Sequence, residues 1–389
     1  MTPILKNNSV ATVLVSHIPI PNKEITSWGK RYTSLVKVES NPYDYVLSPR
    51  PSVDGLKDGG KAQFINCHPR FFKSLTRRFK TLKYWRYRQT LCNLLKKYDR
   101  VFISVIDNVG MLFFINDYLV EKGKRSKCVL HFTICGHSYF YNSKQGCDFY
   151  SCIDELSFLT ETSYLFEVAR NHTIPCEVSI MPNGIDSQAF CPTSQEENER
   201  HKNALNIHGK VVFMWCSQDR PKKGLHVILR AWQESVAVKE DAVLLILGTH
   251  NPPENIPENV KWIGRVPNEE LPKYYRLSEV FLFSTLCHEG LPLSLVEAMK
   301  CGCHCLASNI DPVPEVLRFG DYGELVNNPH VVESWVNAID SVYQHYKAGG
   351  SNPFLAKIPE DLYDLKRWEV MQSELINKWR RRLCNSATK

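Results

Sequence analysis

Short apolar runs bounded by polar residues recur along the whole chain. Runs that do not alternate with polar positions are typical of strands buried on both faces of a parallel sheet. Segments with a helical period, such as 109–121, separate them, and this alternation indicates βαβ units and an α/β fold. The expected strands are 12–16, 45–47, 63–66, 101–105, 128–134 and 153–159, then 210–216, 242–247, 260–266, 280–283 and 302–307.

One of these strands leads into the stretch with the clearest candidate chemistry. The run 280–283 is followed by a short loop with Glu289 and Gly290, and Pro292 suits the first turn of a helix that continues through Glu297. The two carboxylates stand eight residues apart, one at the strand-to-helix turn and one about two turns inside the helix. Phosphorylated ligands bind at such helix N-termini in open α/β sheets. An arbitrary pair of acids would more simply be one helix-start acid and one solvated acid.

A second loop concentrates positive charge after a strand. Residues 217–224 read Ser-Gln-Asp-Arg-Pro-Lys-Lys-Gly, and a helix over 225–232 follows. Several cations beside a helix N-terminus suit a diphosphate. Taken alone, the loop would be interpreted as a solvated basic turn.

Composition limits the class of protein. A length of 389 residues suits two or three domains, and no apolar run approaches the roughly 18 residues of a membrane span. We expect no secretory signal, because no apolar stretch follows Lys6. The 14 cysteines are then expected to be reduced thiols of a cytoplasmic protein. The net charge of +7 suits an anionic ligand or surface.

Most of that positive charge lies between Arg70 and Arg100. This segment holds eleven Lys or Arg against one acid, with seven aromatic residues interleaved. The spacing predicts two basic amphipathic helices, with Lys73, Arg77 and Lys80 away from the apolar side. Such helices can bind an anionic membrane surface or simply form a solvated face. Nucleic acid is a third candidate, which we do not expect because no recognition module surrounds the segment.

Three motifs together resemble family 4 glycosyltransferases, which are retaining enzymes of the GT-B fold. The segment 289–299 is similar to the E-x7-E region of that family. Pro182-Asn183-Gly184-Ile185-Asp186 followed by Phe190 resembles the segment that closes its first domain. Lys223-Gly224 matches its phosphate loop, with Gln218 where an arginine is usual. The resemblance covers 151–326 well and the N-terminal third poorly.

The resemblance implies two Rossmann-like, doubly wound domains that face a central cleft. The expected divisions are an acceptor-side domain over 1–190, a nucleotide-sugar domain over 191–362 and a C-terminal helix over 363–389 that packs back on the first domain. The polar stretch 193–202 is expected to be the linker.

The resemblance also implies roles for individual residues. Glu289 and His137 are the candidate catalytic residues, with His131 as the alternative histidine. Glu289 would hold the donor sugar together with the backbone of Gly290 and Leu291, and His137 would contact it from the other domain. The remaining donor-binding candidates are Lys223, Arg220 and Lys222 for the diphosphate, Glu297 for the ribose, Arg265 and Val266 for the base, and Gly29 in the first loop.

The implied function is retaining transfer of a hexose from a UDP- or GDP-type nucleotide sugar to a glycan or lipid-linked acceptor. Cell-envelope polysaccharide synthesis (lipopolysaccharide, O-antigen or capsule) is the expected setting, in the cytoplasm or peripheral on the inner face of the plasma membrane. No cofactor and no obligatory metal are expected. The alternatives are a sugar-nucleotide epimerase of the same fold and a non-catalytic protein that binds membrane or nucleic acid.

Cysteines 301, 303 and 305 surround His304, as metal ligands could. Their spacing fits no zinc-finger pattern, and alternation would put the three on one face of a buried strand. We therefore expect small core residues rather than a metal site.

Overall fold

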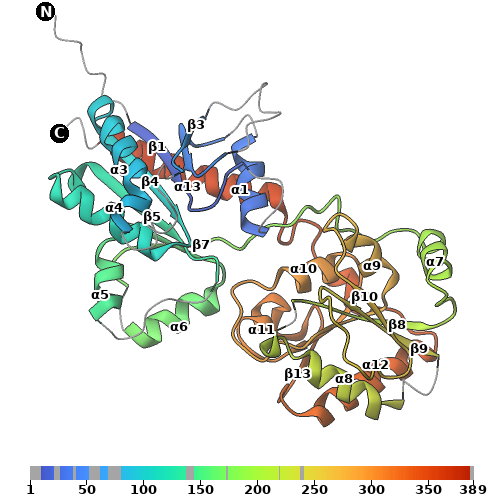
Figure 1. Ribbon diagram of the computed structural model, residues 1–389. Helices are drawn as coiled ribbons and strands as arrows, with labels where there is room; N and C mark the ends of the chain where they lie inside the picture. The colour runs from blue at the N-terminus through green and yellow to red at the C-terminus, as the bar shows by residue number, and fades with distance from the viewer. Residues whose placement is uncertain are drawn as a thin grey trace, which may run out of the picture. The chain divides into compact units, whose positions relative to one another are not determined.

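The computed structural model describes residues 10–21, 27–37, 41–51, 62–68, 80–136, 144–171, 174–218, 220–236 and 241–385 (Figure 1). The chain divides into two compact units, Met1–Pro182 with Lys366–Lys389, and Asn183–Leu365. The first division falls before the expected boundary at 190, and the second falls after the expected boundary at 362. Each unit is described separately below.

The first unit is built on a seven-stranded parallel sheet in the order β3-β2-β1-β4-β5-β6-β7. The chain starts in the middle of the sheet, winds to one edge and then returns to fill the other, as in doubly wound folds. Its elements are β1 (Val10–Val15), α1 (Ser27–Lys37), β2 (Tyr45–Ser48), β3 (Gln63–Asn66), α3 (Lys80–Lys97), β4 (Arg100–Ile106), α4 (Val109–Glu121), η1 (Arg125–Lys127), β5 (Cys128–Thr133), α5 (Lys144–Ser151), β6 (Glu155–Phe158), α6 (Glu161–Asn171) and β7 (Glu177–Ile180).

Helices cover both faces of this sheet, which is why its central strands are apolar on both sides. On one face, α3, α4 and α5 pack against alternate residues of β1, β4 and β5. On the other face lies α1, where Tyr32 meets Trp368 of the last helix edge to face, with ring centroids 5.2 Å apart. The buried apolar residues of the first face include Val13, Val15, Leu91, Ile103, Val105, Met111, Ile115, Leu130, Phe132 and Phe149.

The last helix, α13 (Leu365–Asn385), lies with the first unit, where Figure 1 draws it in red among the blue elements. One lysine and one tryptophan of this helix donate to the carboxylate of Glu155, which is fully buried at the start of β6. Lys378 Nζ lies 3.1 Å and Trp379 Nε1 2.8 Å from the same Glu155 Oε2. The helix is thus anchored by a buried charge as well as by its apolar stripe.

The second unit has a six-stranded parallel sheet in the order β10-β9-β8-β11-β12-β13. Its strand order reverses between β8 and β11, as it does between β1 and β4 in the first unit. Its elements are α7 (Gln195–Ala204), β8 (Val211–Cys216), η2 (Pro221–Lys223), α8 (Leu225–Glu234), β9 (Ala242–Leu247), β10 (Val260–Gly264), α9 (Leu271–Leu277), β11 (Val280–Phe283), α10 (Leu293–Lys300), β12 (His304–Ser308), α11 (Val313–Val316), η4 (Arg318–Gly320), β13 (Glu324–Val326), α12 (Val332–Lys347) and η5 (Leu355–Lys357).

Figure 1 shows α8 and α12 on one side of this sheet and α9 and α10 on the other. The side of α8 and α12 holds the largest aromatic groups, because three tryptophans are fully buried there. On the other side Tyr275 of α9 packs edge to face on Phe281 of β11, with centroids 5.5 Å apart. The core on the side of α8 and α12 includes Phe213, Trp215, Ile228, Trp232, Leu244, Ile246, Leu282, Trp335, Ile339 and Tyr343.

The chain passes between the two units twice. Residues next to these two points are hydrogen-bonded to each other within the second unit. Ile185 donates its N–H to Tyr363 O at 2.8 Å and accepts from Leu365 N at 2.9 Å. Gly184 allows this approach, because a Cβ there would lie 2.5 Å from the Cα of Leu365. The Pro-Asn-Gly segment therefore packs with the second unit from Asn183 onward.

The linker predicted over 193–202 is wrong, because most of this stretch is helix α7. Ser194 caps the helix by accepting from Glu197 N at 3.3 Å. Lys202 is the buried residue of the helix, and its Nζ lies 2.5 Å from Glu279 Oε1. A helix that docks through an ion pair shows no apolar period, which explains why its sequence looks like a linker.

The structure covers the basic segment 70–100 only in part. It contains α3, whose Leu91 and Leu94 are buried as predicted and whose Trp85 is 47% exposed. The first predicted helix, with Lys73 and Arg77, lies outside the described residues. No helix in the described ranges has the length and apolar character needed to cross a membrane.

The three cysteines near His304 are buried, as expected for core residues. Their placement on one strand is wrong, because α10 reaches Lys300 and β12 begins only at His304. Cys301 therefore caps a helix and Cys305 alone lies in the strand; burial raises the pKa of Cys301 to about 12. The described part of the chain holds no group of three or more His, Cys, Asp or Glu side chains that could bind a metal ion.

The anchor of α13 gives a test of stability. In Lys378→Met, the buried Glu155 carboxylate loses its cation, whereas Glu177, which also binds Lys378 Nζ at 2.7 Å, keeps Arg382. We expect the free energy of unfolding of the first unit to fall by roughly 1–3 kcal/mol in urea titrations. The loss should stay below that of a fully buried pair, because the Lys378 side chain is 35% exposed.

The matched control is Arg382→Met on the same helix. Arg382 pairs with Glu177, and both side chains are exposed, at 51% and 43%. This variant should lose less than about 1 kcal/mol. Equal losses for the two variants would show that the buried carboxylate does not anchor the helix.

Candidate functional site

The candidate site lies where the strand order of the second sheet reverses. β8 and β11 are neighbours in the sheet, but the chain leaves them toward opposite edges. The loops that follow their carboxyl ends therefore diverge, and ligands of open α/β sheets bind in the crevice this creates. The predicted phosphate loop follows β8, and the predicted acidic loop follows β11.

These two loops are held together by backbone contacts. Gly224 has φ of +72°, and a Cβ there would lie 2.0 Å from Ser284 O. Ser284 Oγ donates to Lys223 O at 3.0 Å. Beside this bond, Leu286 N donates to Lys222 O at 2.8 Å. The absence of a side chain at 224 thus lets the phosphate loop pack directly on the end of β11.

This contact brings the two main candidate side chains together. Lys223 Nζ lies 2.5 Å from Glu289 Oε1, and the two side chains are only 20% and 14% exposed. Thr285 Oγ1 donates to the same oxygen at 2.6 Å. The Glu289 backbone is held as well, since its N–H donates to Asp311 O after β12 at 3.2 Å. A cation and a carboxylate from separate loops therefore share one partly buried position.

Glu297 lies in α10, as its fifth residue rather than two turns inside the helix, because α10 begins at Leu293 and not at Pro292. Its Oε2 accepts from Tyr275 Oη at 3.2 Å. The pKa of the Cys216 thiol is raised to about 12 by burial and then by the Glu297 charge. Cys216 ends β8, so this carboxylate also lies near the crevice.

The other donor-site candidates of this unit lie at the same edge of the sheet. Arg220 and Lys222 are exposed on the loop after β8. Arg265 follows β10, and its Nε donates to Gly248 O after β9 at 3.3 Å; Val266 beside it is half-buried. Between Glu289 and α10, Gly290 is half-buried and Leu291 is buried.

The candidates of the first unit have a different outcome. His137 lies outside the described residues. His131 is fully buried, with Nδ1 3.0 Å from Ser104 Oγ and Nε2 2.8 Å from Ser157 Oγ. Burial lowers the pKa of His131 to about 3, so it is a neutral interior group and not a site residue. Gly29 is buried inside α1.

The first unit has polar groups of its own at the carboxyl ends of β1 and β4. His17 follows β1 and Asp107 follows β4 with φ of +44°. Burial lowers the pKa of His17, while the Asp107 charge opposes this change. Asp107 Oδ1 also accepts from Cys135 N at 3.0 Å. These residues were not predicted from the sequence, although His17 comes directly after a predicted strand and Asp107 comes two residues after another.

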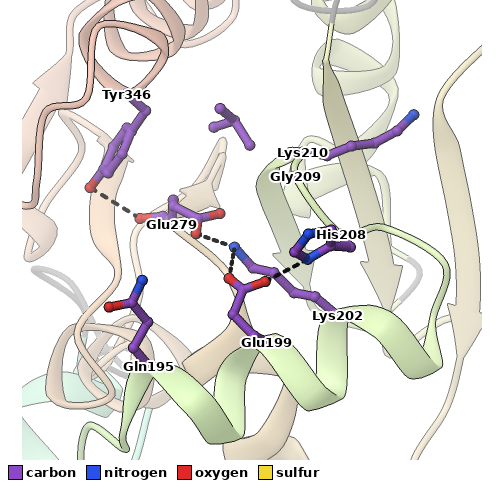
Figure 2. Close-up of a pocket in the computed structure, with 9 residues that line it drawn as sticks. Gln195, Glu199, Lys202, His208, Gly209, Lys210, Glu279 and Tyr346 are labelled. Atoms are coloured by element: carbon purple, nitrogen blue, oxygen red, sulfur yellow. Dashed lines mark hydrogen bonds and ion pairs between the residues drawn. The ribbon is translucent and has the colours of Figure 1, made fainter.

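A cavity of about 470 Å³ opens at the other edge of the second sheet (Figure 2). Glu279 lines it and precedes β11, whereas Glu289 follows the same strand. Its charged groups bind one another: Lys202 pairs with Glu279, and His208 Nδ1 lies 2.7 Å from Glu199 Oε2. We interpret this cavity as part of the packing interface between α7 and the sheet. It is separate from the candidate site.

The residues that hold the site in place were not predicted from the sequence. Ser284 and Thr285 are each 1% exposed and bind the main chain of Lys223 and the side chain of Glu289. Trp215 Nε1 donates to Ser284 Oγ at 3.0 Å. Their one sequence signal is the position of the Ser-Thr pair directly after an apolar strand.

Comparisons with known proteins match the second unit by sequence. Residues 196–348 match the family "Glycosyl transferases group 1". The phosphatidyl-myo-inositol mannosyltransferase of Mycobacterium leprae is 30% identical over 179 residues, which cover 43% of this chain and 46% of that protein. The chain thus matches about half the length of this relative.

Solved structures match nearly the whole chain. Sucrose-phosphate synthase from Thermosynechococcus elongatus aligns with a TM-score of 0.68 at 13% identity, over 95% of this chain and 99% of that one. Anabaena HepE in complex with UDP aligns with a TM-score of 0.70 at 12% identity, over 95% and 100%. These likenesses show the fold, so the two doubly wound units form a GT-B chain, as predicted.

The contact at Gly224 predicts a large effect of one methyl group. Gly224→Ala would combine a strained positive φ with a clash against Ser284 O. We expect the free energy of unfolding of the second unit to fall by about 2–5 kcal/mol, from roughly 1–2 kcal/mol of strain and 1–3 kcal/mol of overpacking.

Gly209→Ala is the control, because Gly209 has φ of +75° and no heavy atom within 4 Å of an added Cβ. It should lose only the strain of about 1–2 kcal/mol. Urea titrations of both variants measure the difference. Equal losses would mean that the loop does not depend on close packing at Gly224.

Proposed function

We propose that this chain is a glycosyltransferase that moves a sugar from a nucleotide-sugar donor to an acceptor. The observation that carries this proposal is the Lys223–Glu289 pair at the point where the strand order reverses. Both residues lie within the region that matches the glycosyl transferases group 1 family. A cation and an acid that meet in such a crevice suit two adjacent parts of a nucleotide sugar, the diphosphate and the sugar hydroxyls.

The diphosphate would bind to the loop after β8. Lys223 is close enough to the crevice to leave Glu289 for a phosphate oxygen, and Arg220 and Lys222 add positive charge beside it. Glu297 would accept hydrogen bonds from the ribose hydroxyls, and the backbone at Arg265 would contact the base. These cations would supply the charge that a divalent ion supplies in other sites, and we propose that no metal is required.

The sugar would bind beside the loop after β11. Glu289 would accept from its hydroxyls, while the backbone of Gly290 and Leu291 contacts the ring. His137 stays a sequence-based prediction for the contact from the first unit. In the step itself, the bond between the anomeric carbon and the diphosphate oxygen breaks, and a bond from the acceptor oxygen forms. The departing phosphate oxygen takes the acceptor proton, which suits retention of configuration without a separate base.

We propose a hexose carried by UDP or GDP as the donor. HepE, one of the structural relatives, is described with UDP, and the M. leprae relative is named a mannosyltransferase. The acceptor is proposed to be a glycan or a lipid-linked glycan of the cell envelope that binds to the first unit. The name of the same relative, which contains phosphatidyl-myo-inositol, supports a lipid-linked acceptor.

Donor binding is tested with UDP, GDP, UDP-glucose and GDP-mannose. We expect one nucleotide series to raise the melting temperature of the protein, because a ligand of the folded state stabilises it. Lys223→Ala should weaken the binding of the nucleoside diphosphate by roughly 10- to 100-fold, since charge-assisted hydrogen bonds contribute about 1.5–3 kcal/mol. Glu289→Gln should bind it as tightly or more tightly, because Lys223 is then no longer held by a carboxylate.

Turnover should respond differently from binding. Glu289→Gln should lose about 10²- to 10³-fold in kcat with the nucleotide sugar, as when a preorganised group is removed. If Lys223→Ala and Glu289→Gln weaken the binding of the nucleoside diphosphate by the same factor, the Lys223–Glu289 pair has a structural role. Conversion of the sugar nucleotide into an epimer without any acceptor would favour the epimerase. No stabilisation by any nucleotide would favour a protein that only binds membrane or other partners.

We also propose that α3 contributes to peripheral binding at an anionic membrane. Lys83 and Lys96 are exposed on this helix, and Trp85 is 47% exposed. A basic helix with an exposed aromatic group suits the headgroup region of a bilayer. The helix contains no acidic residue that would oppose this binding.

Replacing Lys83 and Lys96 together with Gln should weaken binding to anionic vesicles by roughly tenfold or more, since each cation contributes about 1 kcal/mol. Vesicle sedimentation measures this, and added salt should release the wild type. The control replaces Lys122 and Lys124, which follow α4, and so removes the same charge elsewhere. Equal loss in both variants, or equal binding to neutral vesicles, would contradict a role of α3.

A further inference from the structure

Thr285 is a buried hydroxyl beside the candidate catalytic carboxylate. It is 1% exposed and comes two residues after β11 ends. Its Oγ1 lies 2.6 Å from Glu289 Oε1 and 3.2 Å from Cys287 O. A hydroxyl has one hydrogen to donate, and the shorter contact to a charged acceptor is the stronger one. Thr285 therefore donates to Glu289.

Glu289 Oε1 accepts hydrogen bonds from two donors, and these donors differ in how freely they can move. Lys223 carries its ammonium on a long, flexible side chain, and it sits on the loop proposed to bind the diphosphate. Thr285 is short and buried, and Cys287 O, another acceptor within its reach, is farther away at 3.2 Å. The backbone that follows it is fixed, because Leu286 N donates to Lys222 O and Glu289 N donates to Asp311 O.

We propose that Thr285 is a positioning residue that keeps the Glu289 carboxylate in place when Lys223 moves to the diphosphate of the donor. One carboxylate oxygen stays bound to Thr285, and the other is then directed to a hydroxyl of the donor sugar. Thr285 acts through Glu289 and does not touch the donor. The inference rests on the proposed function, because it needs a donor with both a diphosphate and a sugar.

The test compares Thr285→Val, which keeps the shape but removes the hydroxyl, with Thr285→Ser, which keeps the hydroxyl. The assay is release of nucleoside diphosphate from UDP-glucose or GDP-mannose, whichever stabilises the wild type, with water as acceptor. Thr285→Val should lose about 10- to 100-fold in kcat, because it removes a hydrogen bond to a charged group. KM and the affinity for the free nucleoside diphosphate should stay unchanged, and Thr285→Ser should restore most of kcat.

A second comparison separates positioning from a general packing role. In a Glu289→Gln background, Thr285→Val should change kcat little, because the carboxylate that it orients is already gone. The same loss in both backgrounds would show a structural role and overturn the inference. An unchanged kcat in Thr285→Val alone would also overturn it.

Two further outcomes keep the inference separate from the proposed function. If Thr285→Val does not fold, Thr285→Ala replaces it in both backgrounds, with thermal unfolding as the check. Wild-type turnover without any effect of Thr285 removes the inference and leaves the proposed function. Absence of wild-type turnover with every sugar nucleotide would overturn both.

Discussion

The candidate site depends on the close approach of two loops at Gly224. Any side chain there would meet the carbonyl of Ser284, so the backbone of one strand-ending loop can lie directly on the other only with glycine. The Ser284 hydroxyl and the Leu286 amide then bind the carbonyls of the adjacent lysines. Because backbone atoms and one short buried hydroxyl make these contacts, rather than long flexible side chains, the loops that carry Lys223 and Glu289 are held at the ends of the strands.

The ion pair at this position has a consequence for ligand binding. Lys223 and Glu289 are each less than one quarter exposed, and without a ligand each is the counter-charge of the other. The proposed diphosphate would compete with the carboxylate for the lysine, so its binding would exchange one anion for another and would not leave a buried cation unpaired. The released carboxylate would need another donor, and Thr285 is already in contact with it.

The two units show how differently charge can be used in one chain. In the first, Glu155 is fully buried and bound by Lys378 and Trp379, so its charge anchors a helix. At the amino-end edge of the second sheet, Lys202 and Glu279 dock α7 in a similar way. The Lys223–Glu289 pair differs because it lies at the carboxyl ends of strands, where the reversal of strand order leaves room for a ligand.

The sequence by itself predicted an α/β fold, most of its strands and both chemical loops, because apolar runs and strand-ending polar residues are local signals. The doubly wound architecture was implied by the family resemblance, and β7 and β13 were not among the expected strands. Two predictions from local signals were wrong. Helix α7 was predicted to be a linker, because it docks through Lys202 and has no apolar stripe. Residues 302–307 with Cys301 were predicted to be one strand, because the apolar residues continue across the end of α10. Only the tertiary structure decided that Lys223 and Glu289 touch, and that Ser284 and Thr285 hold them. The contacts of Lys223 with Glu289 and with Ser284 join residues more than sixty positions apart, and no local period in a sequence encodes a distance between two loops.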